Sequence, residues 1–176
     1  AMGGIMSITG PEGGEPTRVG ASVGDIIAGL FTTIGVSMAL YHRAMTGEGQ
    51  KIDVSMLDCQ VAVLENAISR YLVNGEVPGP IGNRHPSITP FEGFTASDGY
   101  VIVGAGNDRL WKKLCELLGK PELITDPRFV TNGDRTNNQK ALKPILDSVF
   151  KTKTIDAWLV VLEEAGIPCA PINTVD

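Results

Sequence analysis

The chain has 176 residues, of which 43% are hydrophobic and 20% are charged, a globular composition that excludes a disordered tail and a fibrous repeat. Its 15 basic and 20 acidic residues give a formal net charge of -5, which disfavours binding to a nucleic-acid backbone. The 3 cysteines form no CxxC pair and neither of the 2 histidines has a partner at ligand spacing, so we expect free thiols in a reducing cytoplasm and no metal site.

The first strong element is an apolar run from Ile26 to Tyr41 that contains no charged residue. A run that is apolar on nearly every face predicts a buried core helix. A membrane span needs roughly 20 apolar residues. This run is shorter, and Asp25 and His42-Arg43 bracket it, so we expect no membrane association.

The rest of the first half is predicted to hold a strand, a helix and a loop. The alternation in residues 51–55 is typical of a short strand, and the apolar stripe over residues 57–73 predicts a helix that Asn74-Gly75 closes. Residues 76–90 are rich in proline and glycine and show no periodicity. A stretch of this kind inside a compact chain is usually a linker or a binding loop.

The second half changes to a mixture of strands and helices. Residues 91–96 and 100–103 flank Asp98-Gly99 and predict a β-hairpin. Thr154 is placed to cap a helix that Gly166 ends. Asn132-Gly133 is expected to end a loop, and the two prolines in residues 167–172 favour an extended edge segment. Helices are expected over residues 108–118, 139–150 and 155–165.

These elements predict an α/β chain with two lobes, the second of α+β type. Residues 1–75 form a mainly helical first lobe, and residues 91–176 form a second lobe with a short antiparallel sheet and helices. Residues 76–90 link the two.

The Gly24-Asp25 step, directly before the long apolar helix, is the most suggestive feature for chemistry. One interpretation is a plain N-cap, in which the carboxylate accepts hydrogen bonds from free amides at the helix start. The other is a nucleophilic carboxylate, kept ionised by the helix dipole and open to close approach because Gly24 has no side chain. The residues alone leave both open.

Two other segments contain residues typical of binding sites. Arg84 and His85, in the proline- and glycine-rich loop, are candidates for holding an anion. Gly104-Ala105-Gly106 follows a strand and precedes a helix, but Arg109 stands where a dinucleotide fingerprint has its third glycine. We therefore interpret that segment as an ordinary strand-to-helix turn.

The chain resembles the family III CoA-transferases, the group of the carnitine and formyl-CoA transferases that also includes the α-methylacyl-CoA racemases. The resemblance rests on GASVGDIIAGLF with TGEGQKIDVSMLD in the first half and on DGYVIVGAGNDRLWKKLCELLG with GIPCAPINTV in the second. GNRHPSITPFEGF looks most like the branch that handles succinyl and other dicarboxylyl groups.

The resemblance implies an open α/β large domain that binds coenzyme A and a separate small domain. It also implies a homodimer of interlocked chains, with coenzyme A as co-substrate and acyl-CoA and small carboxylic acids as binding partners. On this basis the chain is expected to be an internal fragment of a longer polypeptide and to be inactive by itself.

The resemblance also implies a mechanism. Asp25 would attack an acyl-CoA thioester to give an aspartyl-acyl anhydride, and the acids would then exchange through an aspartyl-CoA thioester. The amides that follow Asp25 would help to stabilise the oxyanions.

Substrate contacts are expected from Gly24 and from the loop residues Gly82, Asn83, Arg84 and His85. The loop lacks the polyglycine of formyl-CoA transferases, which favours an acyl group larger than oxalate or formate. Arg84 or His85 would then pair with the distal carboxylate of a dicarboxylic acid.

Two alternatives remain beside transfer. A racemase of this family carries a glutamate where Asn107 stands, and an amide cannot exchange the α-proton, so transfer is favoured over racemisation. The second alternative is a non-catalytic lobe that keeps the fold without the chemistry.

Overall fold

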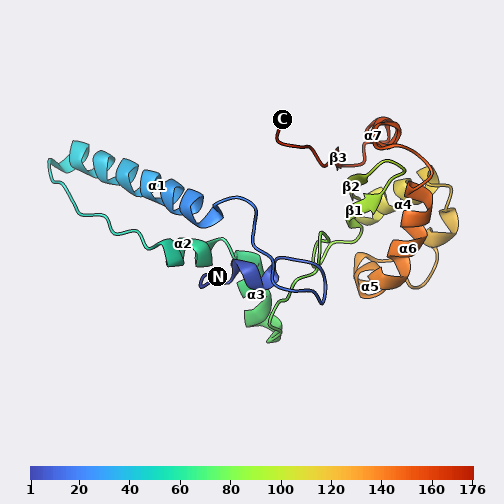
Figure 1. The fold of residues 1–176 in the computed structure, drawn as a ribbon, viewed down its shortest axis with the longest axis horizontal. Coiled ribbons are helices and arrows are strands. Elements are labelled where there is room, and N and C mark those ends of the chain that lie inside the picture. Colours follow the sequence, from blue (N-terminus) through green and yellow to red (C-terminus); the bar gives the residue numbers. More distant parts are fainter. The chain divides into compact units, whose positions relative to one another are not determined.

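The structure, a computed structural model, describes all of residues 1–176. It divides into two compact units, unit 1 (Ala1–Gly82) and unit 2 (Asn83–Asp176), and each is described by itself (Figure 1).

Unit 1 is helical and irregular. Its elements are the 3-10 helix η1 (Ile5–Ile8) and the α-helices α1 (Val23–Thr46), α2 (Met56–Ala62) and α3 (Glu65–Asn74). The predicted helix end at Asn74-Gly75 is confirmed, since Gly75 caps α3 with a left-handed φ of 75°.

Two predictions for unit 1 are wrong. Residues 51–55 are irregular, because unit 1 contains no other strand to satisfy the main-chain groups of a strand there. The helix expected over residues 57–73 is broken at Val63-Leu64 into α2 and α3.

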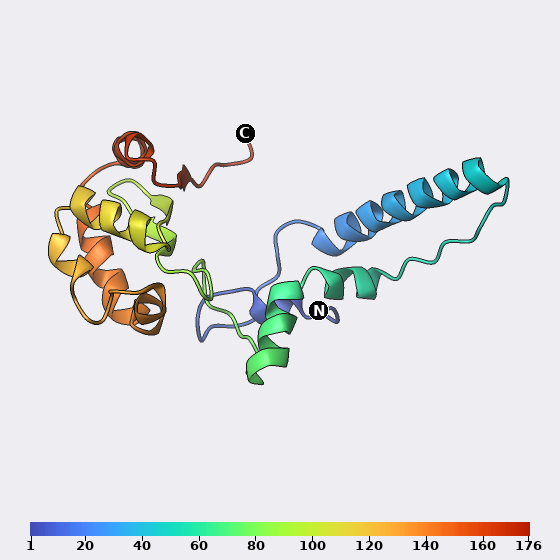
Figure 2. The same ribbon diagram turned by 180° about the vertical axis from the view of Figure 1, so that it is seen from behind.

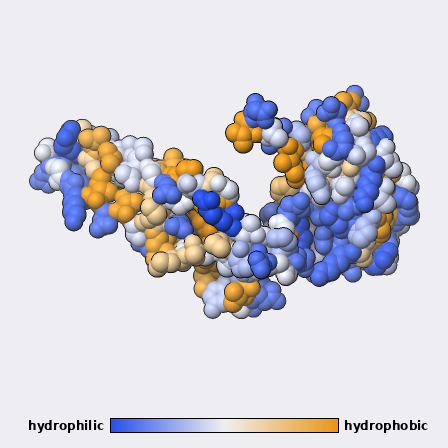
Figure 3. Space-filling model, in the orientation of Figure 1, coloured by the Kyte–Doolittle hydropathy of each residue, from blue (hydrophilic) through white to orange (hydrophobic).

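The expectation that α1 is a buried core helix is also wrong within this chain. None of its residues is buried, and apolar side chains such as Leu30 and Met38 are 59% and 66% exposed. Figure 3 shows this apolar surface along the helix. By length and composition α1 is able to cross a membrane, a test that core helices of soluble proteins also pass. The helix is exposed although α2 contacts it and Ile52 lies against Gly35.

Unit 2 contains one antiparallel sheet of three strands. β1 (Phe91–Thr95) pairs with β2 (Tyr100–Gly104), and β2 pairs with β3 (Cys169–Pro171), in the order β1-β2-β3. The predicted hairpin is confirmed. The extended edge segment is confirmed as well, because β3 pairs on one side only.

Five helical segments complete unit 2, and its helices and sheet lie together in both ribbon views (Figure 1, Figure 2). The predicted cap is confirmed, since Thr154 Oγ1 accepts a hydrogen bond from the Ala157 amide at 3.3 Å. Asn132-Gly133 begins a helix rather than ending a loop, because Thr131 and Asp134 form a capping box around them. The segments are α4 (Asp108–Leu117), η2 (Pro121–Ile124), α5 (Asn132–Asn137), α6 (Gln139–Phe150) and α7 (Ile155–Glu164).

The core of unit 2 is built around aromatic side chains. The Phe150 ring stacks on Phe94 with ring centres 4.7 Å apart and lies 4.9 Å from Trp158. The indole N–H of Trp158 donates to the Phe150 carbonyl at 2.7 Å, so this buried donor is satisfied. The predicted fold class, a helical lobe followed by a small antiparallel sheet with helices, is confirmed.

Candidate functional site

Asp25 lies in the first turn of α1. The helix begins at Val23 after the N-cap Ser22, so Asp25 is the third helical residue and not the N-cap that one sequence interpretation expected. The Ile26 amide donates to the Ser22 carbonyl at 3.0 Å, whereas the amides of Gly24 and Asp25 donate no hydrogen bond. These two N–H groups belong to the unpaired donors that every helix start leaves available.

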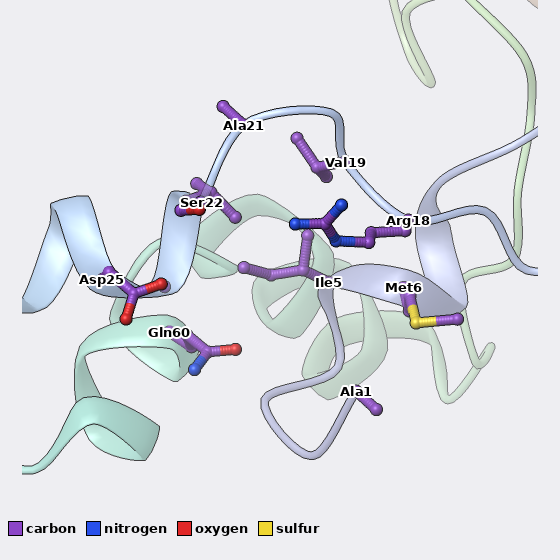
Figure 4. A pocket seen from close by; sticks show the side chains of 11 residues that line it. Ala1, Ile5, Met6, Arg18, Val19, Ala21, Ser22, Asp25 and Gln60 are labelled. Carbon is purple, nitrogen blue, oxygen red and sulfur yellow. The ribbon is translucent and has the colours of Figure 1, made fainter.

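A pocket of about 220 Å³ opens at this helix start. Figure 4 shows the Asp25 carboxylate beside the Gln60 amide at one side, while the Arg18 guanidinium extends toward the middle from the other. The pocket is lined by Ala1, Ile5, Met6, Arg18, Val19, Ala21, Ser22, Val23, Gly24, Asp25 and Gln60.

Gln60 from α2 is held between two glycine backbones. A Cβ added to Gly24 would lie 3.0 Å from Gln60 Nε2, and one added to Gly3 would lie 2.5 Å from Gln60 Cβ. The Gln60 amide also donates to the Met56 carbonyl at 3.4 Å. Gly24 therefore has a packing reason in the structure, because a side chain there would push the Gln60 amide away from Asp25.

Two positively charged features lie near the Asp25 carboxylate on this pocket and favour binding of an anionic ligand. Arg18 makes no ion pair with a protein carboxylate, so its charge faces the pocket and solvent. The start of a long helix adds partial positive charge next to Asp25. In the whole chain no group of three or more His, Cys, Asp or Glu side chains is arranged to hold a metal ion.

The loop that contains the other predicted residues is ordered by its own contacts in unit 2. The His85 amide donates to the Phe91 carbonyl at 2.9 Å, and the His85 ring stacks on Phe91 with centres 5.5 Å apart. His85 Nδ1 accepts the Ser87 amide at 3.2 Å, so the neutral imidazole carries its proton on Nε2. The His85 ring is therefore fixed by the Ser87 amide and by its stacking on Phe91.

Arg84 faces a carboxylate of the protein itself. Glu92 is buried on β1, and burial raises the pKa of its carboxyl group, while the Gln139 amide and the charges of Lys143 and Arg84 oppose that rise. Gln139 Nε2 donates to Glu92 Oε1 at 3.0 Å, and Lys143 Nζ lies 3.9 Å from Glu92 Oε2. The positive charge of Arg84 is thus partly compensated before any substrate binds.

The predicted site residues fall in both units. Gly24, Asp25 and Gly82 belong to unit 1, whereas Asn83, Arg84 and His85 belong to unit 2. Only Gly24 and Asp25 line the pocket described above. The substrate contacts expected of Gly82, Asn83, Arg84 and His85 stay predictions.

Sequence reasoning missed two residues of the pocket, Arg18 and Gln60. Arg18 is the only charged residue between Glu15 and Asp25, so its place just before the candidate carboxylate was an available signal. Gln60 is a polar residue in the otherwise apolar run that follows Asp58. Nothing in the spacing indicates that it meets Gly24, because that contact joins two separate helices.

The comparisons with known proteins place the chain in a family. The family described as CoA-transferase family III matches residues 1–176, and the chain belongs to this family. The resemblance stated from the sequence is thereby confirmed.

Individual relatives cover the chain almost completely. It is 46% identical over 173 residues to an acetyl-CoA:oxalate CoA-transferase of Acetobacter aceti, an alignment that covers 98% of this chain and 44% of the relative. It is 40% identical over 174 residues to a succinyl-CoA:glutarate CoA-transferase of Mus musculus, covering 99% of this chain and 40% of the relative. A crystal structure of a CAIB/BAIF family protein from Brucella suis matches with a TM-score of 0.82 and 44% identity, over 99% of this chain and 46% of that one. The chain thus spans less than half the length of the relatives it matches.

Proposed function

We propose that the protein that contains this chain transfers coenzyme A between carboxylic acids and that Asp25 is its covalent nucleophile. The observation that carries the proposal is the position of Asp25 in the first turn of α1, on a pocket that also holds two unpaired amides and the Arg18 guanidinium. The names of the relatives support the reaction class, since they describe CoA-transferases for acids such as oxalate, glutarate and mesaconate.

The proposed reaction proceeds in balanced acyl-transfer steps. An oxygen of the Asp25 carboxylate attacks the thioester carbonyl of the donor, the C–S bond breaks, and CoA thiolate leaves, so that an aspartyl-acyl anhydride remains. The thiolate then attacks the aspartyl carbonyl, which releases the first acid and leaves an aspartyl-CoA thioester. The acceptor carboxylate and the thiolate repeat these two steps in reverse order, which gives the new acyl-CoA and restores the Asp25 carboxylate.

Each step passes through a tetrahedral oxyanion that needs hydrogen-bond donors. The expectation that the amides after Asp25 supply them is corrected by the helix geometry, because the Ile26 amide already donates to Ser22. The amides of Gly24 and Asp25 are available instead. We assign them, together with the Gln60 amide on the same pocket, as the donors for this oxyanion.

We propose a dicarboxylic acid as the acid substrate. Arg18 supplies a cation on the wall of the Asp25 pocket, and oxalate, glutarate and mesaconate in the names of the relatives are all dicarboxylic. The relative that acts on oxalate gives no support to the idea that the missing polyglycine excludes a short acid. Asn107 favours transfer over racemisation, because an amide cannot exchange the α-proton. In the structure its side chain caps α4, where it accepts a hydrogen bond from the Leu110 amide at 2.9 Å.

The test compares two aspartates that occupy the same helical position. Asp25 is the third residue of α1 and Asp58 is the third residue of α2, and both are exposed. In a protein that contains this chain at the full length of its relatives, we expect Asp25→Asn to lower CoA transfer by about a thousandfold or more, as loss of a covalent nucleophile does. We expect Asp58→Asn to stay within about twofold of wild type, as surface changes usually do.

Trapping identifies the intermediate directly. With succinyl-CoA and hydroxylamine, we expect wild type and Asp58→Asn to gain a hydroxamate on Asp25, found by mass spectrometry of the peptide, and Asp25→Asn to gain none. Transfer that survives Asp25→Asn, or a hydroxamate on another carboxylate, would overturn the assignment. Exchange of an α-proton in deuterated water without an acceptor acid would point to racemisation instead.

A further inference from the structure

Arg135 is the most completely buried charged residue of the chain, with a relative exposure of 0%. Its guanidinium also lies 5.1 Å from the centre of the Trp111 ring. The hydrogen bonds run from Nε to the Thr89 carbonyl at 2.8 Å, from Nη1 to the carbonyls of Phe129 and Val130 at 3.1 Å each, and from Nη2 to the Gly106 carbonyl at 2.7 Å and to Asp108 Oδ1 at 3.0 Å.

Burying a charged guanidinium destabilises a protein unless its N–H donors are hydrogen-bonded, so the partners of Arg135 show what it does in the fold. Ion pairing contributes little to the stabilisation of the buried Arg135, because its only carboxylate partner is Asp108, whose side chain is 70% exposed. The other partners are main-chain carbonyls in three segments. Arg135 therefore joins the end of the loop before β1, the turn between β2 and α4, and the segment before α5.

Two neighbours of Arg135 on α5 bind the same loop. Asn132 Oδ1 accepts the Thr89 amide at 3.0 Å, and Asn132 Nδ2 donates to the Ser87 carbonyl at 2.8 Å. Thr136 Oγ1 lies 3.1 Å from Thr89 Oγ1. Asn132, Arg135 and Thr136 are called the α5 clamp below. The clamp holds both polar main-chain groups of Thr89 as well as its hydroxyl.

Residues 87–89 of the loop also pack against the β2-α4 turn, whose Gly106 carbonyl Arg135 binds. A Cβ added to Gly106 would lie 2.0 Å from Ile88 Cγ2, so only glycine allows this approach. Residues 87–89 are thus held from one side by α5 and from the other by the β2-α4 turn. Arg84 and His85, directly upstream, take their position from a loop whose far end is secured in this way.

We propose that Arg135, through the α5 clamp, is a positioning residue that sets the placement of Arg84 and His85 for the acid substrate. The inference rests on the proposed function and adds to it that Arg84 and His85 bind the acid substrate, the contacts that the sequence analysis expects of them. Arg135 itself touches no reacting group. Its contribution is to hold the loop in the binding conformation, so its loss should weaken binding of the acid and leave the chemistry at Asp25 intact.

The experiment uses the protein at the full length of its relatives and two variants that keep side-chain volume. Arg135→Lys keeps the charge but loses most of the five bonds. Asn132→Asp still accepts the Thr89 amide but cannot donate to the Ser87 carbonyl. The matched control is Arg128→Gln, an arginine four residues before Asn132 whose half-exposed guanidinium pairs with Asp126.

Two measurements are made on each variant. Amide hydrogen exchange of residues 85–89 should become about tenfold faster in both clamp variants and stay unchanged in the control, as expected when a buried hydrogen bond is lost. With succinyl-CoA as donor and glutarate as acceptor, the KM for glutarate should rise about fivefold to tenfold. The kcat and the KM for succinyl-CoA should stay within about twofold of wild type.

The outcomes separate the clamp from the reaction. Unchanged exchange of residues 85–89 in both variants would show that α5 does not hold the loop. Faster exchange with an unchanged KM for glutarate, or a kcat that falls with the folded fraction, would reduce Arg135 to a structural residue. If wild type transferred no CoA to any acid, the proposed function would fail and positioning for an acid with it, while the exchange data would still report on the clamp. If Arg135→Lys fails to fold, the amide exchange and the KM for glutarate of Asn132→Asp are sufficient to test the proposal.

Discussion

Unit 1 and unit 2 differ in how they bury apolar surface. Unit 2 has a continuous core of 17 buried residues gathered from its strands and helices. In unit 1 the buried residues are Gly3 and Cys59, and most apolar side chains of α1 are exposed. Burial of apolar surface is the main favourable contribution to folding. Unit 2 is therefore built to fold by itself, whereas unit 1 depends on surface that these residues do not supply.

The difference bears on the predicted site residues of each unit. Asp25 and its pocket lie in the unit without a core, and Arg84 and His85 lie on a loop that the core-bearing unit holds through α5. The loop that contains Arg84 and His85 should thus be ordered regardless of unit 1. The surroundings of Asp25, by contrast, should be ordered only when α1 is covered.

The largest expected effect is on independent folding. Residues 83–176 expressed alone should unfold cooperatively with heat, because the whole core lies within them. Residues 1–82 expressed alone should show no cooperative transition, because α1 has no covering surface. Circular dichroism measures both, and tryptophan fluorescence adds to the first, since Trp111 and Trp158 both lie in unit 2.

A cooperative transition of residues 1–82 as a monomer would contradict the conclusion that unit 1 does not fold by itself. A concentration-dependent transition would instead show that α1 is covered by self-association. Sedimentation at several concentrations distinguishes these two outcomes.

The second prediction compares one large apolar side chain from each unit. Phe150→Ala should lower the free energy of unfolding of unit 2 by about 3–5 kcal/mol, because it removes a fully buried ring that stacks on Phe94 and contacts Trp158. Leu30→Ala should change the stability of the 176-residue chain by less than about 0.5 kcal/mol, because the side chain is 59% exposed. Urea titrations followed by fluorescence for unit 2 and by circular dichroism for α1 provide the measurement.

A cost above about 2 kcal/mol for Leu30→Ala in the isolated chain would contradict the exposure of α1. The same cost in a protein at the full length of its relatives would show that α1 becomes buried there. The two variants therefore measure whether α1, exposed in the 176-residue chain, is buried in the longer protein.

The sequence predicted unit 2 better than unit 1 for the same physical reason. Local signals such as Thr154 at a helix start, Gly166 at a helix end and Asp98-Gly99 in a hairpin act in a unit whose tertiary contacts agree with them. In unit 1 the alternation in residues 51–55 had no partner strand to pair with. A local pattern can predict an element, but it cannot supply the surface that the element needs.

The candidate site divides in the same way. Asp25 was predicted because Gly-Asp before a long apolar helix is a local pattern. Gln60 and Arg135 were not predicted, because their roles come from contacts between distant segments. Gln60 meets Gly24 across two helices, and Arg135 binds Thr89 46 positions earlier in the chain. A single sequence carries no signal for such contacts.

The smallest expected effect concerns the buried carboxyl group of Glu92 in unit 2. Burial raises its pKa above the ordinary 4.5, so the folded state binds the proton more tightly than the unfolded state. The stability from this group is complete below the ordinary pKa and is lost as the pH rises through the raised value. We therefore expect the free energy of unfolding of wild type, relative to Glu92→Gln, to increase as the pH falls from 7 toward 4.5.

Glu116→Gln is the matched control, because Glu116 is exposed on α4 of the same unit. Its difference from wild type should stay nearly flat over this range, as measured by urea titrations at several pH values. The opposite slope for Glu92→Gln would mean that Lys143 and Arg84 stabilise the Glu92 anion by more than burial costs. In that case Arg84 would be committed to Glu92, and the cation available to a dicarboxylic acid would be Arg18, on the pocket of unit 1.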